Sequence, residues 1–174
     1  MKTSWQVATA AEAFAAAQFS RCGWDVSVQY GANQPEYDLV VVNGNRLLKV
    51  SVKGSRDGSW GLTQSFLKSA AYHEAIDVWL RKHTEKTIFC LVQFKNVSLK
   101  ELPRMYVVTP TELASHLKRC AGNRGDTILH EYHEWGPRAK ASGTIDHIPE
   151  SWEFTEERIE EICKTLNQHE SLYG

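Results

Sequence analysis

Two apolar runs joined by an Asn-Gly pair form the clearest local pattern in the chain. The runs are YDLVVV (residues 37–42) and RLLKVSV (46–52), on either side of Asn43 and Gly44. An Asn-Gly pair between such runs predicts a β-hairpin with a tight turn. Because alternate residues of a strand share a face, the second run predicts one core face and one polar face. The core face carries Leu48, Val50 and Val52, and the other carries Leu47, Lys49, Ser51 and Lys53.

The remaining pattern alternates between helical and extended stretches. Alanine-rich sequence without Gly or Pro predicts a helix over 5–22, ended by Gly23. Three further helices are expected over 62–80, 110–120 (capped by Thr109 or Thr111) and 155–166. Strands are expected over 24–30, 87–94 and 105–109, with one more over 125–135, and loops over 31–36, 55–61 and 136–143.

The last predicted helix carries its own docking signal. Thr155 is a suitable N-cap, and an apolar stripe at helical spacing should pack on the body of the protein. The stripe comprises Ile159, Ile162, Cys163 and Leu166. No linker rich in Pro, Gly or Ser interrupts the chain, which favours one compact unit.

Composition narrows the class of protein. A chain of 174 residues with 42% hydrophobic and 24% charged residues is long enough to bury a core. A net charge of −1 argues against coating nucleic acid by bulk charge. No apolar run reaches the length of a membrane span, and the N-terminus lacks a signal-peptide pattern. The four cysteines form no CxxC pair, so we expect reduced thiols, no membrane and a cytoplasmic location.

The hairpin brings three polar side chains together. Counting outward from the Asn-Gly turn places Asp38, at the start of the first strand, near residues 49–51 of the second. Asp38, Ser51 and Lys53 therefore converge at one end of the hairpin. Glu12 is a further candidate, because it interrupts an alanine-rich helix turn. Its carboxylate either faces solvent or is directed at a group that needs it.

The predicted elements follow a familiar order. A helix with Glu12 comes first, then a strand, a strand opened by Asp38, and a strand ended by Lys53. A helix and a strand follow. This order resembles the PD-(D/E)XK nuclease superfamily over residues 8–109, through AAEAFAAAQFSRCGWDV, PEYDLVVV and LLKVSVKG. The resemblance implies an α/β, restriction-endonuclease-like fold, with a mixed central sheet flanked by helices (an αβββαβ core). Residues 1–110 would form the nuclease-like core, and 111–174 a C-terminal helical extension packed on the same domain.

The resemblance also implies a metal-dependent DNA endonuclease, possibly selective for DNA structure and acting as a homodimer. Asp38 and Glu12 would bind metal, with the main-chain carbonyl of Val52. Lys53 would orient the attacking water and steady charge at the phosphate. The all-oxygen ligand set implies Mg²⁺, with Mn²⁺ as a substitute. DNA contacts are expected from Lys49, Arg56 and Trp60, although Trp60 could equally be buried against the following helix.

Ser51 departs from the family, which usually carries Asp or Glu here and sometimes Gln. Three interpretations remain open. The site works with Glu12 and Asp38 while Ser51 holds a water; a carboxylate has migrated, with Glu74 of the following helix as candidate; or the chemistry is lost. In the last case the chain is a non-catalytic pseudo-nuclease that binds DNA or assembles with a protein partner.

Other motifs add little. HEYHEW (130–135) has HExH spacing instead of the HExxH of zinc proteases, so a surface or edge strand is expected. No GxxxxGK[ST] or GxGxxG element occurs, and we expect no nucleotide cofactor.

Overall fold

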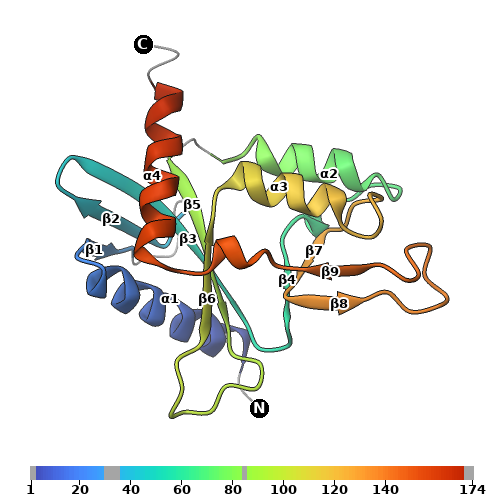
Figure 1. Cartoon of the computed structure of the whole chain (residues 1–174), viewed down its shortest axis with the longest axis horizontal. Helices are drawn as coiled ribbons and strands as arrows, with labels where there is room; N and C mark the ends of the chain where they lie inside the picture. The colour runs from blue at the N-terminus through green and yellow to red at the C-terminus, as the bar shows by residue number, and fades with distance from the viewer. Residues whose placement is uncertain (1–2, 30–35, 84–85, 171–174) are drawn as a thin grey trace.

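A five-stranded mixed sheet forms the centre of the protein, in a computed structural model that describes residues 3–29, 36–83 and 86–170 (Figure 1). The strand order is β1-β2-β3-β5-β6, and only the β3–β5 pair is parallel. The strands are β1 (Asp25–Val28), β2 (Leu39–Asn43), β3 (Arg46–Ser55), β5 (Thr87–Gln93) and β6 (Arg104–Val108). The predicted strand end at Tyr30 and loop residues 31–35 lie outside the described residues.

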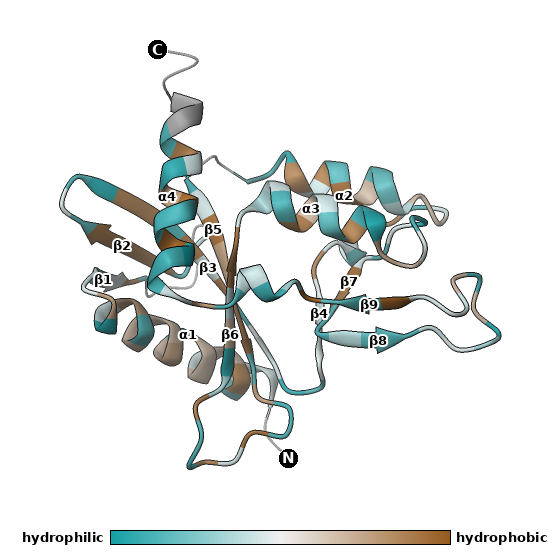
Figure 2. Cartoon of the chain, in the orientation of Figure 1, coloured by the Kyte–Doolittle hydropathy of each residue, from teal (hydrophilic) through white to brown (hydrophobic). Residues whose placement is uncertain are grey.

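Helices cover both faces of this sheet. On one face α1 (Ser4–Arg21) and α4 (Glu156–Glu170) share a buried cluster with Val50, Val52 and Cys90. On the other face α2 (Tyr72–Leu80) and α3 (Pro110–Arg119) pack on Phe89 and Leu91. Figure 2 shows hydrophobic residues along the central strands and mostly hydrophilic ones along the outer side of α4. The predicted α/β fold class, with its αβββαβ order and C-terminal helix, is confirmed.

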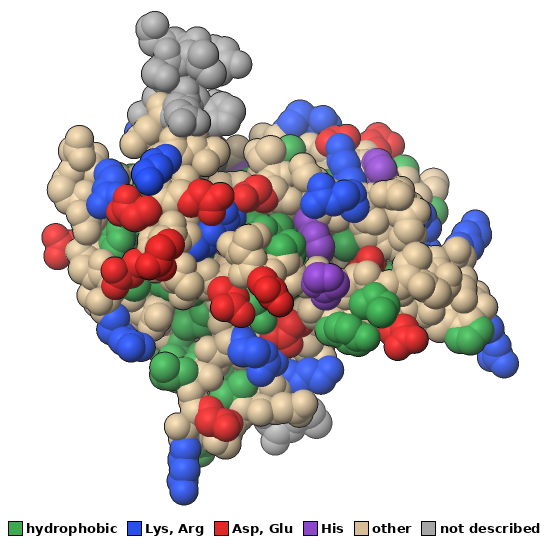
Figure 3. Space-filling view, viewed as in Figure 1, with side chains coloured by type: hydrophobic (Ala, Val, Ile, Leu, Met, Phe, Trp, Pro, Cys, Tyr) green, Lys and Arg blue, Asp and Glu red, His purple; other side chains and the backbone are tan. Residues whose placement is uncertain are grey.

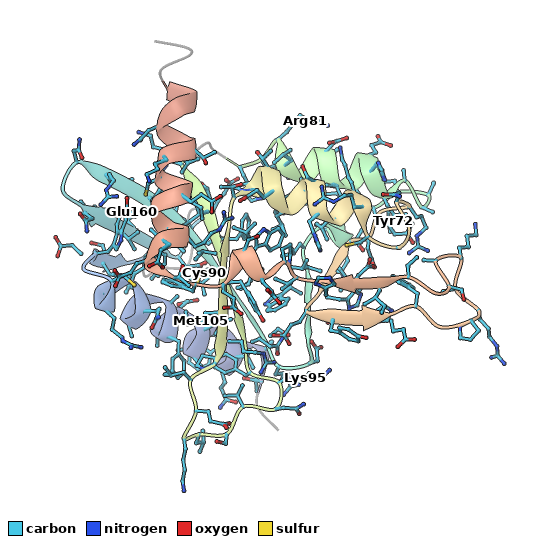
Figure 4. The ribbon with its side chains drawn as sticks, in the orientation of Figure 1. Tyr72, Arg81, Cys90, Lys95, Met105 and Glu160 are labelled. Carbon is cyan, nitrogen blue, oxygen red and sulfur yellow. The ribbon has the colours of Figure 1, made fainter. Side chains whose placement is uncertain are left out.

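The hairpin has the register that its turn predicts. Asn43 pairs with Arg46 and Leu39 with Val50, and Gly44 adopts a φ of 62°. Leu48, Val50 and Val52 are buried, as expected for the core face. Glu160 lies on α4, where Figure 4 labels it. It forms an ion pair with Arg46 at the start of β3, so the last helix contacts the hairpin.

The N-termini of α3 and α4 are capped by residues that the sequence predicts as caps. Thr109 caps α3 in a reciprocal capping box with Glu112, and Pro110 occupies the first helical turn. Thr155 Oγ1 accepts the Arg158 N–H at 3.1 Å at the start of α4. Arg158 is buried and donates to both carboxylate oxygens of Glu112 at 2.8 Å, which joins α4 to α3. The predicted stripe residues Ile159, Ile162 and Cys163 are buried in the core.

The prediction of a helix over 62–80 is wrong for the first half of that range. Residues Gln64–Phe66 form a single 3₁₀ turn, η1, and α2 begins only at Tyr72. Between them Ser69 and Ala70 have φ values of 50° and 59°, which a right-handed helix cannot contain. The chain therefore turns before α2 and brings η1 against that helix.

Two small sheets lie beside the central one. β4 (Ser59–Gly61) pairs with β7 (Ile128–His130), and β8 (Tyr132–Glu134) pairs with β9 (Ile145–His147). The loop expected over 55–61 thus contains a strand, and the single strand expected over 125–135 is two strands. They divide at Glu131, whose carboxylate accepts from Arg104 at 2.7 and 2.8 Å and from the Tyr106 hydroxyl at 2.8 Å. The β8–β9 hairpin projects from the body (Figure 1).

Among the described residues, no helix combines the length and hydrophobicity that crossing a bilayer requires. The four cysteines form no disulfide.

Candidate functional site

Asp38 lies directly before β2, at the point where β3 runs on without a partner strand on that side. Its N–H donates to the Val50 carbonyl at 2.9 Å, beside the Leu39–Val50 pair that ends the β2–β3 register. Its Oδ2 accepts the Val52 N–H at 2.6 Å. The carboxylate thus replaces the missing strand as the acceptor for β3, and this bond fixes its position at the end of the hairpin.

Glu12 reaches the same end of the sheet because α1 packs closely on β3 at Gly54. A Cβ on Gly54 would lie 2.9 Å from the Ala11 Cβ and 2.9 Å from the Val7 carbonyl oxygen, so only glycine permits this approach. Partial burial raises the pKa of Glu12, the nearby charge of Asp38 raises it further, and Lys53 opposes both. The charges of Asp38 and Lys53 are thus close enough to act on the Glu12 carboxylate.

Ser51 and Lys53 line a cleft of about 270 Å³ on the α2 side of the sheet. Ser51 is buried, and Lys53 is partly exposed. No ion pair joins Lys53 to Asp38 within the described part of the chain. A simple Asp–Lys ion pair, the structural alternative for these two residues, is therefore not what holds them at this edge.

The donor atoms at this edge suit a hard cation. Main-chain N–H and C=O groups of one strand residue point to the same side, so the Val52 carbonyl faces the edge where Asp38 accepts its N–H. Glu12, Asp38 and this carbonyl offer only oxygen. Among the described residues no three His, Cys, Asp or Glu side chains are grouped as a metal site. Mg²⁺ is commonly held by one or two carboxylates with water and substrate phosphate, so the set fits that ion.

The predicted DNA contacts differ in accessibility. Lys49 is partly exposed and lies 5.2 Å from the centre of the Tyr37 ring, and Arg56 is exposed. Trp60 is only 3% exposed, and its Nε1–H donates to the Lys53 carbonyl at 2.9 Å. Its ring therefore has no face free for stacking on a base, and it supports the main chain at Lys53 instead.

Glu74, the candidate for a migrated carboxylate, is exposed in the first turn of α2. Trp79 is the residue of α2 that lines the cleft with Ser51. The two are five positions apart, and at about 100° per residue they lie about 140° apart around the helix. The structure thus does not bring Glu74 to Ser51.

The cleft contains two residues that the motif search did not select, Glu36 and His83. Glu36 precedes Asp38 by two positions, yet it lines the cleft and Asp38 does not, so the motif around Asp38 gives no signal for it. His83 follows α2, and no sequence pattern points to it. Its Nδ1 lies 3.8 Å from a Glu36 carboxylate oxygen. Lys82 also lines the cleft, with its Nζ 4.6 Å from the centre of the Phe66 ring.

The HEYHEW segment has a structural arrangement. His130 and His133 stack with ring centres 4.4 Å apart, and Trp135 meets His133 edge-on at 4.6 Å. His130 Nε2 lies 3.7 Å from Asp126. His130 ends β7 and His133 lies in β8, two strands of the small peripheral sheets, as the strand interpretation of this motif expects.

Comparison with known proteins identifies the fold. No family model and no curated protein matches the sequence. The structure is similar to that of a bacterial homing endonuclease, I-Ssp6803I, with a TM-score of 0.51. The alignment covers 94% of this chain and 95% of that chain at 16% sequence identity. At this identity the likeness establishes the fold that the two chains share.

Proposed function

We propose that the chain is a metal-dependent endonuclease of the PD-(D/E)XK type that hydrolyses phosphodiester bonds in DNA. The observation that carries the proposal is the convergence of Asp38, Glu12 and Lys53 where β3 extends past β2. Their order and strand context match the superfamily motif. The shared fold of an enzyme named as a homing endonuclease supports the same class of activity.

In this proposal each residue has a separate task. Asp38 and Glu12, with the Val52 carbonyl, would hold Mg²⁺, which supplies positive charge at the phosphodiester and lowers the pKa of water. The hydrogen bond from Val52 keeps the Asp38 carboxylate aimed at the site. Lys53 donates to the attacking water or to a phosphate oxygen and stabilises the charge that develops there.

DNA would approach from the cleft side of the protein. Lys53 and Lys82 line that cleft, whereas α4 covers the opposite face of the sheet; Lys49 and Arg56 are the further contacts that the motif implies. Figure 3 shows acidic side chains gathered over α4 and the segment before it. These exposed residues include Glu153, Glu156, Glu157, Glu160 and Glu161. Their negative charge would repel phosphate and direct the duplex to the other face.

The proposed assembly follows from the chemistry. One site cuts one strand, so cleavage of both strands favours a homodimer, with residues 1–110 as the nuclease-like core. Residues 111–174 then form an extension on the same domain, because side chains of α3 and α4 belong to the two clusters that also contain the sheet.

The test is cleavage of supercoiled plasmid, linear duplex, single-stranded and branched DNA with Mg²⁺, Mn²⁺ or EDTA. We expect metal-dependent cleavage that Asp38→Ala and Lys53→Ala abolish and that the exposed α4 variant Lys164→Ala retains. The preferred substrate would define the class of nuclease. Cleavage that survives in EDTA, or in both site variants, would contradict the proposal.

Ser51 favours one alternative, a pseudo-nuclease that binds DNA or a protein partner without cutting. A neutral hydroxyl in place of a carboxylate lowers the negative charge available to a cation. That alternative requires salt-sensitive DNA binding that neither Mg²⁺ nor Asp38→Ala changes.

A further inference from the structure

We propose that the β8–β9 hairpin lies in the major groove of duplex DNA, where Arg138 and Lys140 at its tip contact the phosphates along the groove. The hairpin comprises residues 132–147, and the loop 135–144 is its tip. This inference rests on the proposed function for its DNA substrate. It adds a contact surface that lies outside the cleft and outside the nuclease motif.

The tip of the hairpin carries only positive charge. Arg138 and Lys140 are both exposed, and the loop 135–144 contains no Asp or Glu. Neither side chain forms an ion pair with any residue that the structure describes. The hairpin projects from the body (Figure 1), and Figure 3 shows Lys or Arg side chains at its outer end. Two unpaired cations on a projecting loop complement the phosphate backbone of DNA.

Hydrogen bonds hold the loop in one shape before any ligand binds. Asp146 is buried, and its Oδ2 accepts the Trp135 Nε1–H at 2.7 Å and the Ala121 N–H at 2.9 Å. The Trp135 N–H donates to the Thr144 carbonyl at 3.0 Å, which closes the base of the loop. An ordered loop loses little conformational entropy on binding, so the two cations are presented at low cost.

The base of the hairpin is built on the same packed layer as the cleft. β7 leads into the hairpin and pairs with β4, where Trp60 donates to the Lys53 carbonyl at 2.9 Å. Leu129 before the hairpin and Ile148 after it are buried in one cluster with Trp79, which lines the cleft. A duplex held at the cleft can therefore extend over the hairpin.

The width of a two-stranded ribbon selects the major groove. That groove is about 12 Å wide and admits such a ribbon, whereas the minor groove is only about 6 Å wide. Tyr132 and Ile145 lie on one face of the hairpin with their cross-strand partners His147 and Glu134. Tyr132 is 63% and Ile145 is 51% exposed. Apolar side chains can contact the thymine methyl group, and a glutamate can accept from the amino group of cytosine.

The first experiment titrates a short fluorescent duplex in EDTA, which prevents cutting, at several salt concentrations. The double variant Arg138→Ala, Lys140→Ala should bind about tenfold more weakly. Its slope of log affinity against log salt should fall by about 2, because two phosphate contacts are lost. The control Lys100→Ala, Lys164→Ala removes the same charge at exposed positions elsewhere and should bind as the wild type does. Thermal melting of each variant checks the fold.

The second experiment tests the groove. A duplex whose cytosines carry glucosylated hydroxymethyl groups has bulky substituents in the major groove, and distamycin occupies the minor groove. Wild-type protein should bind the glucosylated duplex about tenfold more weakly than the plain one, and distamycin should not compete. The hairpin variant should discriminate less between the two duplexes. Competition by distamycin together with equal binding of both duplexes would overturn the assignment to the major groove.

The outcomes separate this inference from the proposed function. Wild-type affinity and salt slope in the hairpin variant, together with loss of nicking in Asp38→Asn, would overturn the role of the hairpin and leave the nuclease proposal standing. Hairpin-dependent binding by a wild type that nicks no DNA with either metal would support the hairpin and overturn the nuclease. A wild type that binds no duplex would overturn both.

Discussion

Asp38 has a structural task in the hairpin and, in the proposed nuclease, a chemical task as well. Its Oδ2 accepts the Val52 N–H, and its charge acts on Glu12. The sequence predicted that Asp38 lies beside β3 at the end of the hairpin, because an Asn-Gly turn fixes the register of a hairpin by local rules. It could not predict Glu36 beside His83, because that pair depends on how the segment after α2 returns to the sheet.

Burial at His116 gives a prediction on acid stability. The ring is 9% exposed and packs on Trp152, and burial, with a smaller contribution from Arg119, lowers its pKa to about 4. Between pH 6.5 and 4 the unfolded chain takes up a proton that the folded chain refuses, so stability falls with pH in this window. The loss is at most about 3 kcal/mol.

Urea unfolding at pH 7 and pH 4.5 measures that loss. His116→Phe should show less destabilisation on acidification than wild type, because no imidazole remains to be protonated there. The exposed His73→Gln should keep the wild-type response. An unchanged response in His116→Phe would show that other groups govern acid unfolding.

At the scale of elements, the contact of α1 with β3 determines where Glu12 lies. Gly54 sets that contact, because any larger side chain would meet Ala11 and the Val7 carbonyl. Glu12 directly follows Ala11, the residue of α1 at this contact. Packing and chemistry are thus linked through a single small residue.

Gly54→Ala should therefore lower the free energy of unfolding by about 1–3 kcal/mol and weaken Mn²⁺ binding, since α1 must move away from the sheet. Urea unfolding and Mn²⁺ titration measure the two effects. Gly136→Ala is the matched control, because a Cβ there meets nothing within 4 Å, and its stability should change by less than about 1 kcal/mol. Equal stability of both variants would show that α1 tolerates the displacement.

The elements that sequence predicted well are those specified by neighbouring residues. The hairpin, α1 and the caps at Thr109 and Thr155 belong to this group. The helix over 62–80 failed because Ser69 and Ala70 take left-handed backbone angles, and nothing in their residue types requires this. The pairing of β4 with β7 joins segments far apart in the chain, so no local pattern reveals it.

At the scale of the whole molecule, exposed glutamates gather over α4 and the segment before it (Figure 3). The cleft on the α2 side of the sheet is lined by Lys53, Lys82 and Glu36. A net charge of −1 conceals this distribution. Composition alone therefore argues only against coating DNA through a high overall charge. It does not show which surface would contact DNA.

Lys82→Ala and Lys164→Ala test the direction of DNA approach with the same change of charge. Lys82→Ala should weaken binding of a short duplex and reduce the slope of log affinity against log salt by about 1, because one phosphate contact is lost. Lys164, exposed on α4, should leave both unchanged. Titration at several salt concentrations provides the values, and a larger effect from Lys164→Ala would place the duplex on the α4 face.

The most direct measurement for the central claim is Mg²⁺-dependent nicking of supercoiled plasmid by the wild type and by Asp38→Asn. Asparagine retains an oxygen that accepts the Val52 N–H and removes only the charge, so the fold at the end of the hairpin is preserved. We expect nicking by the wild type, its loss in EDTA and its loss in the variant at an unchanged melting temperature. Equal nicking by the two proteins would contradict the assignment of this sheet edge as the active site.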